Sequence, residues 1–230
     1  MVNDQIHPFP AIPEEESGLA RQRAPEDARR EQILGAAHAV ALRAGIDGVT
    51  VRAVAAEAGV SHGLLIFYFK QKDQLIAALL DRLLATTDLL RRSDDVVHGQ
   101  HAPDRLRSLL RHEMEHLARD PHDFRLFLEY WALGTRRPSI RAKIAAALAR
   151  YRSVLRTMAE GMLSDDPARH DDITADGFAA VAVSLISGCA IQAMSDPDGF
   201  DVAAYIGTVR GLVERLDTSS AGLRPRETTV

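Results

Sequence analysis

Apolar side chains recur at steps of three and four residues along most of the chain, which is the spacing of one face of an α-helix. In the stretch 25–44, Ile33, Ala37 and Val40 follow this spacing, and Gly45 ends the run. No run of alternating apolar and polar residues predicts a strand. We therefore expect an all-α protein.

Capping residues, glycines and prolines predict where the helices begin and end. Thr50 is the expected N-cap of a short helix that Gly59 closes, and Ser61 is the expected N-cap of a second short segment. Later breaks fall at prolines, because proline disfavours helix for the residue before it. The predicted helices after the second short segment span about 73–92, 104–119, 122–134, 138–163, 171–195 and 199–217.

Residues 50–69, TVRAVAAEAGVSHGLLIFYF, have the form of a helix-turn-helix. Ala55 is small where the two helices must pack closely, and Gly59 stands where the chain turns sharply and positive φ is favoured. The apolar positions between the helices are Val54, Val60, Leu65 and Phe69. The positions predicted to face outward from the second helix are Ser61, His62, Gly63, Leu64, Phe67 and Tyr68. An outward face of this kind is what a recognition helix presents to the DNA major groove.

The charge distribution supports DNA contact only locally. The chain has a net charge of -4, so it is not a polycation as a whole. Between Thr50 and Lys72, however, Arg52, Lys70 and Lys72 face a single acid, Glu57, and this local surplus suits phosphate contacts. The predicted base contacts are Arg52 and His62, and the predicted phosphate contacts are Thr50, Tyr68 and Lys72.

The region around this motif resembles the TetR family of bacterial transcriptional regulators. The matching residues are Ile33-Leu34-Gly35-Ala36-Ala37, Gly45, Thr50, Ala58-Gly59-Val60-Ser61, Tyr68-Phe69 and Lys72-Asp73-Gln74-Leu75. The chain departs from the family pattern at Ile66, where many members have a tyrosine that contacts phosphate. We expect Tyr68 to carry more of that contact here.

The second half resembles the C-terminal domain of BetI-like members of that family. The matching residues are Glu129-Tyr130-Trp131, Pro138, Ser187-Gly188-Cys189-Ala190-Ile191-Gln192-Ala193 and Asp196-Pro197. The resemblance implies a homodimer whose last two long helices pair with their mates, and a repressor that a small molecule releases from its operator. The uncharged stretch 178–195 suits such an interface, and a core helix within one subunit is the alternative.

These observations predict two domains between two disordered tails. The expected boundaries are 1–22 for the first tail, 23–72 for the helix-turn-helix domain, 73–217 for a ligand-binding and dimerisation domain, and 218–230 for the last tail. The N-terminal residues lack the apolar core of a signal peptide, and one cysteine, Cys189, fits a reducing compartment. We expect a cytoplasmic protein that binds operator DNA and a small effector, with no cofactor, membrane or enzymatic activity.

The stretch HEMEH supports a competing interpretation. His112, Glu113 and His116 match the HExxH pattern of zinc peptidases, and His122 stands where a longer pattern has its third ligand. That longer pattern requires a glycine where this chain has Arg119. We predict a polar helix face without metal, with a zinc-dependent hydrolase or a metal-sensing regulator as the alternatives.

Methionines and aromatic residues recur at helical spacing in the second half. They are typical of a plain core, and in a regulator some of them line an apolar ligand pocket. A few polar groups beside them suit a small, partly apolar organic molecule. The predicted ligand-binding residues are Met114, His116, Phe127, Tyr130, Trp131, Tyr151, Met158 and Gln192.

Overall fold

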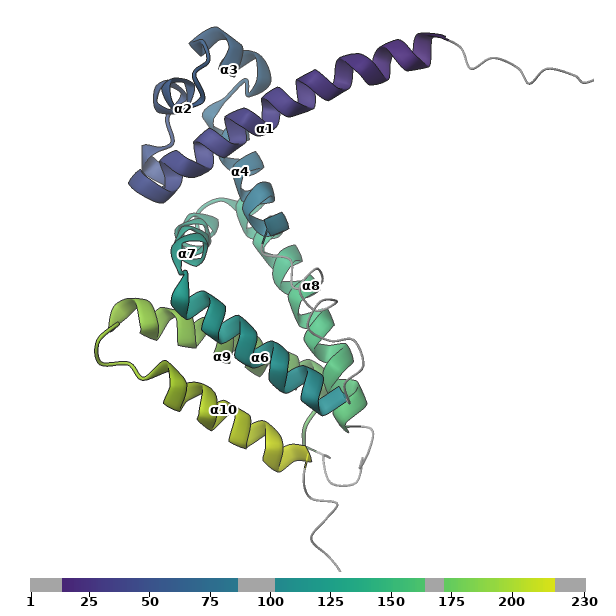
Figure 1. The fold of residues 1–230 in the computed structure, drawn as a ribbon, viewed down its shortest axis with the longest axis vertical. Coiled ribbons are helices and arrows are strands. Elements are labelled where there is room, and N and C mark those ends of the chain that lie inside the picture. The colour runs from purple at the N-terminus through teal and green to yellow at the C-terminus, as the bar shows by residue number, and fades with distance from the viewer. Residues whose placement is uncertain (1–13, 87–101, 164–171, 218–230) are drawn as a thin grey trace, which may run out of the picture. The chain divides into compact units, whose positions relative to one another are not determined.

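The computed structural model describes residues 14–86, 102–163 and 172–217, and every regular element in these ranges is an α-helix, as the sequence predicts (Figure 1). The chain divides into two compact units, Met1–Leu79 and Leu80–Val230. Helix α4 (Lys72–Thr86) runs through the division. The predicted tail at 218–230 lies outside the described residues.

In the described part of the first unit, the chain forms α1, α2, α3 and the start of α4. Helix α1 (Glu14–Gly48) packs against α2 (Val51–Ala58), and α2 packs against α3 (His62–Tyr68). Ile33 and Ala37 of α1 are fully buried, so the periodicity seen in the sequence does mark the core face. Gly45 interrupts the helical conformation with φ 70° and ψ 177°.

Helix α1 begins earlier than the sequence led us to expect. It starts at Glu14, inside the segment 1–22 that we interpreted as a disordered tail, and only residues 1–13 of that segment lie outside the description. The sequence there begins with three glutamates, and acidic residues favour a helix N-terminus.

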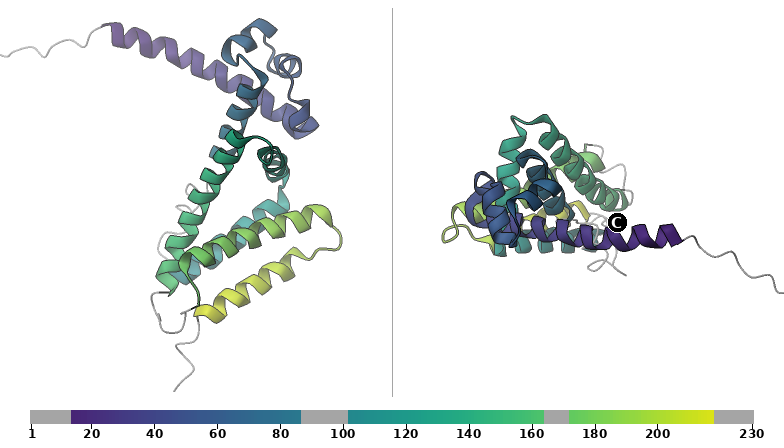
Figure 2. Two further views of the ribbon diagram at one scale, coloured as in Figure 1. Left: turned by 180° about the vertical axis from the view of Figure 1, so that it is seen from behind. Right: turned by 90° about the horizontal axis from the view of Figure 1, so that it is seen from above.

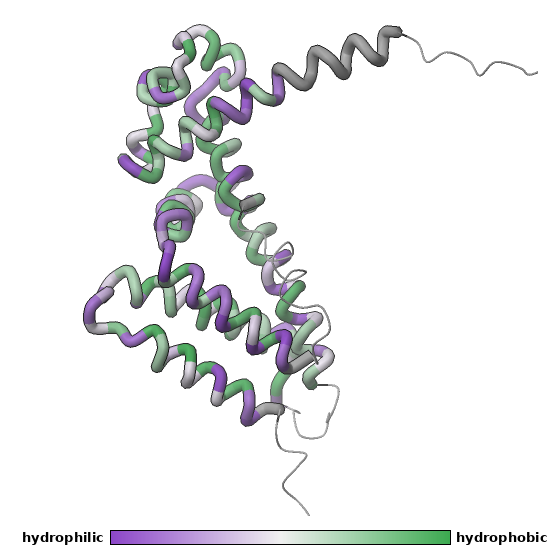
Figure 3. Tube along the Cα trace, in the orientation of Figure 1, coloured by the Kyte–Doolittle hydropathy of each residue, from purple (hydrophilic) through white to green (hydrophobic). Residues whose placement is uncertain are grey.

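The described residues of the second unit form the end of α4 and the helices that follow it. These are α6 (Ala102–Arg119), α7 (His122–Gly134), α8 (Pro138–Leu163), α9 (Ala175–Ser195) and α10 (Val202–Asp217). Helix α9 packs against α6 and α8, and α10 packs against α6 and α9, so α6, α9 and α10 lie side by side (Figure 1 and the left view of Figure 2). Polar and apolar positions alternate along α6 and α10, as in amphipathic helices (Figure 3).

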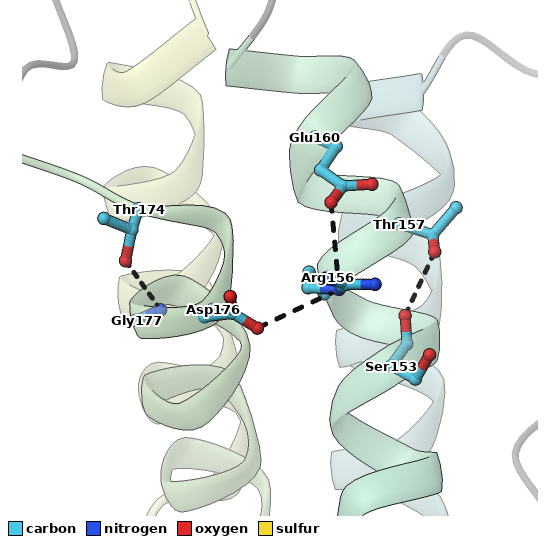
Figure 4. A network of polar contacts seen from close by, with 7 residues as sticks. All are labelled: Ser153, Arg156, Thr157, Glu160, Thr174, Asp176 and Gly177. Atoms are coloured by element: carbon cyan, nitrogen blue, oxygen red, sulfur yellow. Dashed lines mark hydrogen bonds and ion pairs between the residues drawn. The ribbon is translucent and has the colours of Figure 1, made fainter.

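A local hydrogen bond sets the start of α9. The Thr174 hydroxyl accepts a hydrogen bond from the Gly177 amide at 3.0 Å, so α9 begins just after Thr174 (Figure 4). Arg156 of α8 places its Nε 3.7 Å from a carboxylate oxygen of Glu160 and 3.9 Å from one of Asp176, which links α8 to the first turn of α9. Helix α9 begins at Ala175 and α10 begins at Val202, each a few residues later than predicted.

Helix α9 has two unlike faces. Its length and composition would allow it to cross a membrane. Inside the protein, 28% of its most apolar stretch is buried. Ala182 and Cys189 lie in the subunit core at 1% and 0% exposure, whereas Val181 and Ile191 are 57% and 42% exposed. The same helix thus supplies a core face and an exposed apolar face.

Candidate DNA interface and effector core

Two hydroxyl groups fix the starts of α2 and α3. The Thr50 Oγ1 accepts a hydrogen bond from the Ala53 amide, and the Ser61 Oγ accepts one from the Leu64 amide, each at 3.1 Å. Accepting these bonds leaves each hydroxyl proton free to point elsewhere. Thr50 and Ser61 are both exposed, so each hydroxyl can cap its helix and donate to a phosphate oxygen at the same time.

The turn between the two helices depends on Gly59. This residue has φ 65° and ψ 32°, in the left-handed region that favours glycine. Its amide donates to the Ala56 carbonyl at 3.3 Å, and the Val60 amide donates to the Ala55 carbonyl at 3.0 Å. These two bonds form a Schellman motif, which ends α2 and directs the chain into α3.

Buried side chains hold α3 from behind. Leu65 is 0% exposed, and Phe69, which follows the helix, is 2% exposed. The Arg30 guanidinium of α1 lies 5.3 Å from the centre of the Phe69 ring, within the range of a cation–π interaction. Because these side chains are buried on the inner side of α3, the opposite side of the helix faces solvent.

The exposed side of α3 differs in part from the prediction. His62, Gly63 and Phe67 are exposed as expected. Phe67 has a large apolar side chain and is 69% exposed. Leu64 and Tyr68 are half-buried, and the Tyr68 ring packs edge-on against Phe67 with centroids 5.3 Å apart. Of the six residues predicted to face outward, Ser61, His62, Gly63 and Phe67 are therefore exposed, and Leu64 and Tyr68 are not fully so.

Ile66 is an exposed residue that is not among the DNA contacts predicted from the sequence. It is 42% exposed on α3. The helical period carried the necessary signal, because residue 66 lies one turn after His62 and so shares its face. We had treated Ile66 only as a departure from the family pattern.

Arg52 of α2 and Lys72 at the start of α4 are exposed cations in the same unit as α3. Within the described residues, no ion pair or hydrogen bond engages the side chain of either one. Glu57, the one acidic residue between Thr50 and Lys72, is bound by the Arg43 guanidinium at 2.9 Å, which offsets its charge. This unit therefore exposes cations that suit phosphate groups.

In the second unit, the structure gathers three of the predicted ligand-binding residues. Met114 and Met158 lie in one apolar core, and Tyr151 packs against it. The Tyr151 hydroxyl donates to Glu113 Oε2 at 3.3 Å, and Glu113 is only 2% exposed. A carboxylate thus lies inside an otherwise apolar region, which sequence reasoning had considered only as part of HEMEH.

Tyr130 forms a second buried polar position, on α7. It is 0% exposed, and burial raises the pKa of its phenol, with the carboxylates of Asp81 and Glu129 adding to the effect. The group therefore stays neutral at physiological pH. Asp81 also accepts hydrogen bonds from Lys143 Nζ at 2.5 and 2.8 Å, which joins α4 to α8.

The remaining predicted ligand-binding residues lie outside that core. Trp131 is 58% exposed, and Gln192 is exposed on α9. His116 and Phe127 are half-buried, and Phe127 stacks on a neighbouring phenylalanine of α7 with ring centroids 6.1 Å apart. A groove of about 950 Å³ between α6 and α10 is lined by Met114 but by none of the other predicted residues.

The HEMEH stretch lies on α6 in a geometry that does not suit a zinc peptidase. The rings of His112 and His116 stack with centroids 6.4 Å apart, while Glu113 is buried and bound to Tyr151. In a zinc peptidase this glutamate must reach the metal-bound water, on the side of the histidines. No group of three metal-ligating side chains occurs in the described parts of the chain. Nothing in this arrangement supports the hydrolase alternative.

A helix-turn-helix whose second helix is exposed, in a unit that also exposes unengaged cations, is typical of a DNA-binding protein. Residues 33–79 match the family model described as "Bacterial regulatory proteins, tetR family". Residues 101–218 match the model described as "BetI-type transcriptional repressor, C-terminal". The chain belongs to the TetR family of transcriptional regulators, with a second half of the BetI type, and the resemblance noted in the sequence is confirmed.

Individual relatives agree with this assignment. The chain is 31% identical over 183 residues to an uncharacterized HTH-type transcriptional regulator in the dhlA 5' region of Xanthobacter autotrophicus, covering 76% of this chain and 85% of that protein. It is 25% identical over 175 residues to the HTH-type transcriptional regulator BetI of Vibrio vulnificus, covering 75% and 84%. A putative transcriptional regulator from Saccharomonospora viridis, solved in complex with choline, has the same fold, with a TM-score of 0.68, 21% identity and coverage of 82% and 96%. Regulators of this family are soluble DNA-binding proteins and are generally not enzymes.

Proposed function

We propose that this regulator is a cytoplasmic, homodimeric repressor that leaves its operator when a small organic molecule binds in the second unit. The observation that carries the proposal is the exposed face of α3 in a unit that also exposes the cations Arg52 and Lys72. The helix-turn-helix domain would span 23–72, and the ligand-binding and dimerisation domain would span 73–217. These assignments go beyond the family membership itself.

The DNA contacts divide by chemistry. Arg52 can present two donors to guanine O6 and N7, and His62 lies at the start of α3, where base edges are within reach. Thr50, Tyr68 and Lys72 carry a hydroxyl or an ammonium group for phosphates. The surface between these contacts would be formed by Ser61, Gly63, Leu64 and Phe67.

Dimerisation is proposed to use α9 and α10. Val181 and Ile191 of α9 and Leu212 of α10 are large apolar side chains at 57%, 42% and 51% exposure. Such a surface is costly in water and suits a second copy of the same chain. A two-fold dimer implies a palindromic operator with half-sites about one helical turn apart, roughly 34–36 Å, or a multiple of that distance.

The effector is proposed to bind around Met114, Tyr130, Tyr151 and Met158. Glu113 adds a buried carboxylate beside Tyr151, and a carboxylate with aromatic faces favours an organic cation. Choline is the first compound to test, because the Saccharomonospora viridis neighbour was solved with it. The further proposed contacts, toward the surface, are His116, Phe127, Trp131 and Gln192.

The DNA assignment can be tested with matched arginine and lysine variants. Sequences selected from random duplexes would supply the operator. Arg52→Ala should then lose about 1–3 kcal/mol at one base position and relax specificity there. Lys72→Ala should weaken binding to all sequences and reduce the salt slope by about 0.9.

The control is Arg152→Ala, an exposed arginine on α8 outside the proposed interface. It should leave both operator affinity and the salt slope unchanged. Equal behaviour of all three variants, or selection of no sequence at all, would contradict the proposed DNA interface.

The effector assignment can be tested with the single tryptophan. Choline titrated into the protein–operator complex should change Trp131 fluorescence and release DNA together, with a coupling of about 1–3 kcal/mol. Glu113→Gln removes the charge but keeps the shape, so it should weaken choline binding more than operator binding. If fluorescence and operator affinity both stay unchanged at millimolar choline, choline is not the effector.

A further inference from the structure

We propose that Ile66 and Phe67 recognise thymine methyl groups, so that the operator half-site carries thymine at the positions that face α3. The inference rests on the proposed DNA-binding function and goes beyond it by naming the chemistry that is read. It also gives a role to Ile66, which cannot make the phosphate hydrogen bond of the tyrosine found there in many family members.

The first observation is an apolar face on a DNA-binding helix. Ile66 and Phe67 are 42% and 69% exposed, and they are the two exposed large hydrophobic side chains among the described residues of the first unit. The helical period places Ile66 one turn after His62, and Phe67 one turn after Gly63. The four residues therefore form one continuous outward face, half of which is apolar.

The second observation is the empty space over Gly63. A Cβ atom added to this glycine would meet nothing within 4 Å, and its φ is not positive. Neither packing nor backbone conformation within the chain requires glycine there, although glycine weakens a helix. The bare backbone between His62 and Ile66 instead lets a partner approach α3 closely.

Thymine is the base that fits such a face. Its C5-methyl is the one apolar group that the bases present in the major groove, whereas the other base edges present hydrogen-bond donors and acceptors. The unengaged cations Arg52 and Lys72 lie in the same unit and suit the phosphates of a duplex. Because the chain belongs to a family of DNA-binding regulators, DNA is favoured over another protein or a lipid surface as the occupant of this face.

The test begins with the full-length protein and a random duplex library. Once an enriched half-site is known, each thymine is replaced in turn by deoxyuridine, which lacks only the methyl group. Losing one buried methyl should weaken binding roughly fourfold, the factor that corresponds to ~0.8 kcal/mol. Thymines outside the half-site should be insensitive to the same replacement.

Protein variants then assign the effect to residues. Ile66→Ala and Phe67→Ala alter exposed side chains, and circular dichroism would verify that each variant is folded. Each should bind the thymine operator more weakly and lose most of the difference between thymine and deoxyuridine at one position. Arg52→Ala is the matched control: it should lower affinity but keep the full deoxyuridine effect.

The outcomes separate this inference from the function on which it rests. If no sequence is enriched, the proposed DNA-binding function fails. If a sequence is enriched but deoxyuridine has no effect at any position, the function stands and methyl recognition is overturned. If deoxyuridine weakens binding equally in wild type, Ile66→Ala and Phe67→Ala, other residues read the methyl groups and this assignment is overturned.

Discussion

The two units both expose large apolar side chains, but in opposite electrostatic settings. Ile66 and Phe67 of the first unit share that unit with the unengaged cations Arg52 and Lys72. The exposed face of α9 in the second unit lies within the uncharged stretch 178–195. An apolar surface near cations suits a polyanion, whereas one without charges suits another copy of itself. Charge near the surface, and not apolarity alone, distinguishes the proposed DNA face from the proposed dimer face.

The largest expected effect would break the α9 side of this comparison. Val181→Glu with Ile191→Glu would place unpaired charges in the proposed dimer interface, at a cost of about 3–5 kcal/mol for each buried charge. Sedimentation should then show monomers, and operator affinity should fall because one subunit holds only one half-site.

Ala182→Glu sharpens the same test, because Ala182 is 1% exposed inside the subunit. That variant should unfold the second unit instead of separating intact subunits. A wild-type protein that sediments as a monomer at micromolar concentration would eliminate the proposed interface.

A smaller effect should test whether the two units are stabilised independently. Leu65→Ala removes a side chain that is 0% exposed behind α3, and it should lower the stability of the first unit by about 2–5 kcal/mol. Hydrogen exchange should then accelerate in α2 and α3 and stay unchanged in α9. Leu155→Ala, also at 0% exposure, should show the reverse pattern. Faster exchange in both units from either variant would mean that they unfold together.

The buried phenol of Tyr130 predicts a pH dependence that is confined to the second unit. Burial raises the pKa of Tyr130 in the folded protein, while an unfolded tyrosine ionises near pH 10. The stability is therefore fully present below about pH 10 and falls by about 1.4 kcal/mol per pH unit above it. Tyr130→Phe should flatten this decline in alkaline denaturation curves. Identical slopes for the two proteins would show that Tyr130 does not control it.

The smallest effect concerns the glycine on the DNA face. Gly63→Ala should stabilise the first unit by about 0.5–1 kcal/mol and yet weaken operator binding, because the added methyl occupies the space that the bases need. Gly35→Ala is the matched control, since a Cβ there also meets nothing within 4 Å. It should add similar stability and leave operator binding as it is. Equal DNA affinity for both variants would show that no partner uses the space over Gly63.

Local signals let the sequence determine the elements and the motif. Thr50, Gly59 and Ser61 act on neighbouring backbone groups, so their capping and turning roles follow from position alone. The predicted bounds of α7 and α8 agree with the structure for the same reason, because Pro121 and Pro138 stand at their starts. The class of protein was therefore accessible from a stretch of the chain whose interactions are short in sequence.

Tertiary packing alone decided which side chains are exposed. Sequence spacing put Trp131 among the predicted pocket residues and left Ile66 out of the predicted DNA contacts, yet both side chains are exposed. It grouped Glu113 with two histidines, but α8 contacts α6 and its Tyr151 draws that carboxylate into the core. The reason is physical. A largely apolar helix such as α9 has apolar side chains on several faces, and neighbouring helices that are distant in sequence determine which face becomes buried.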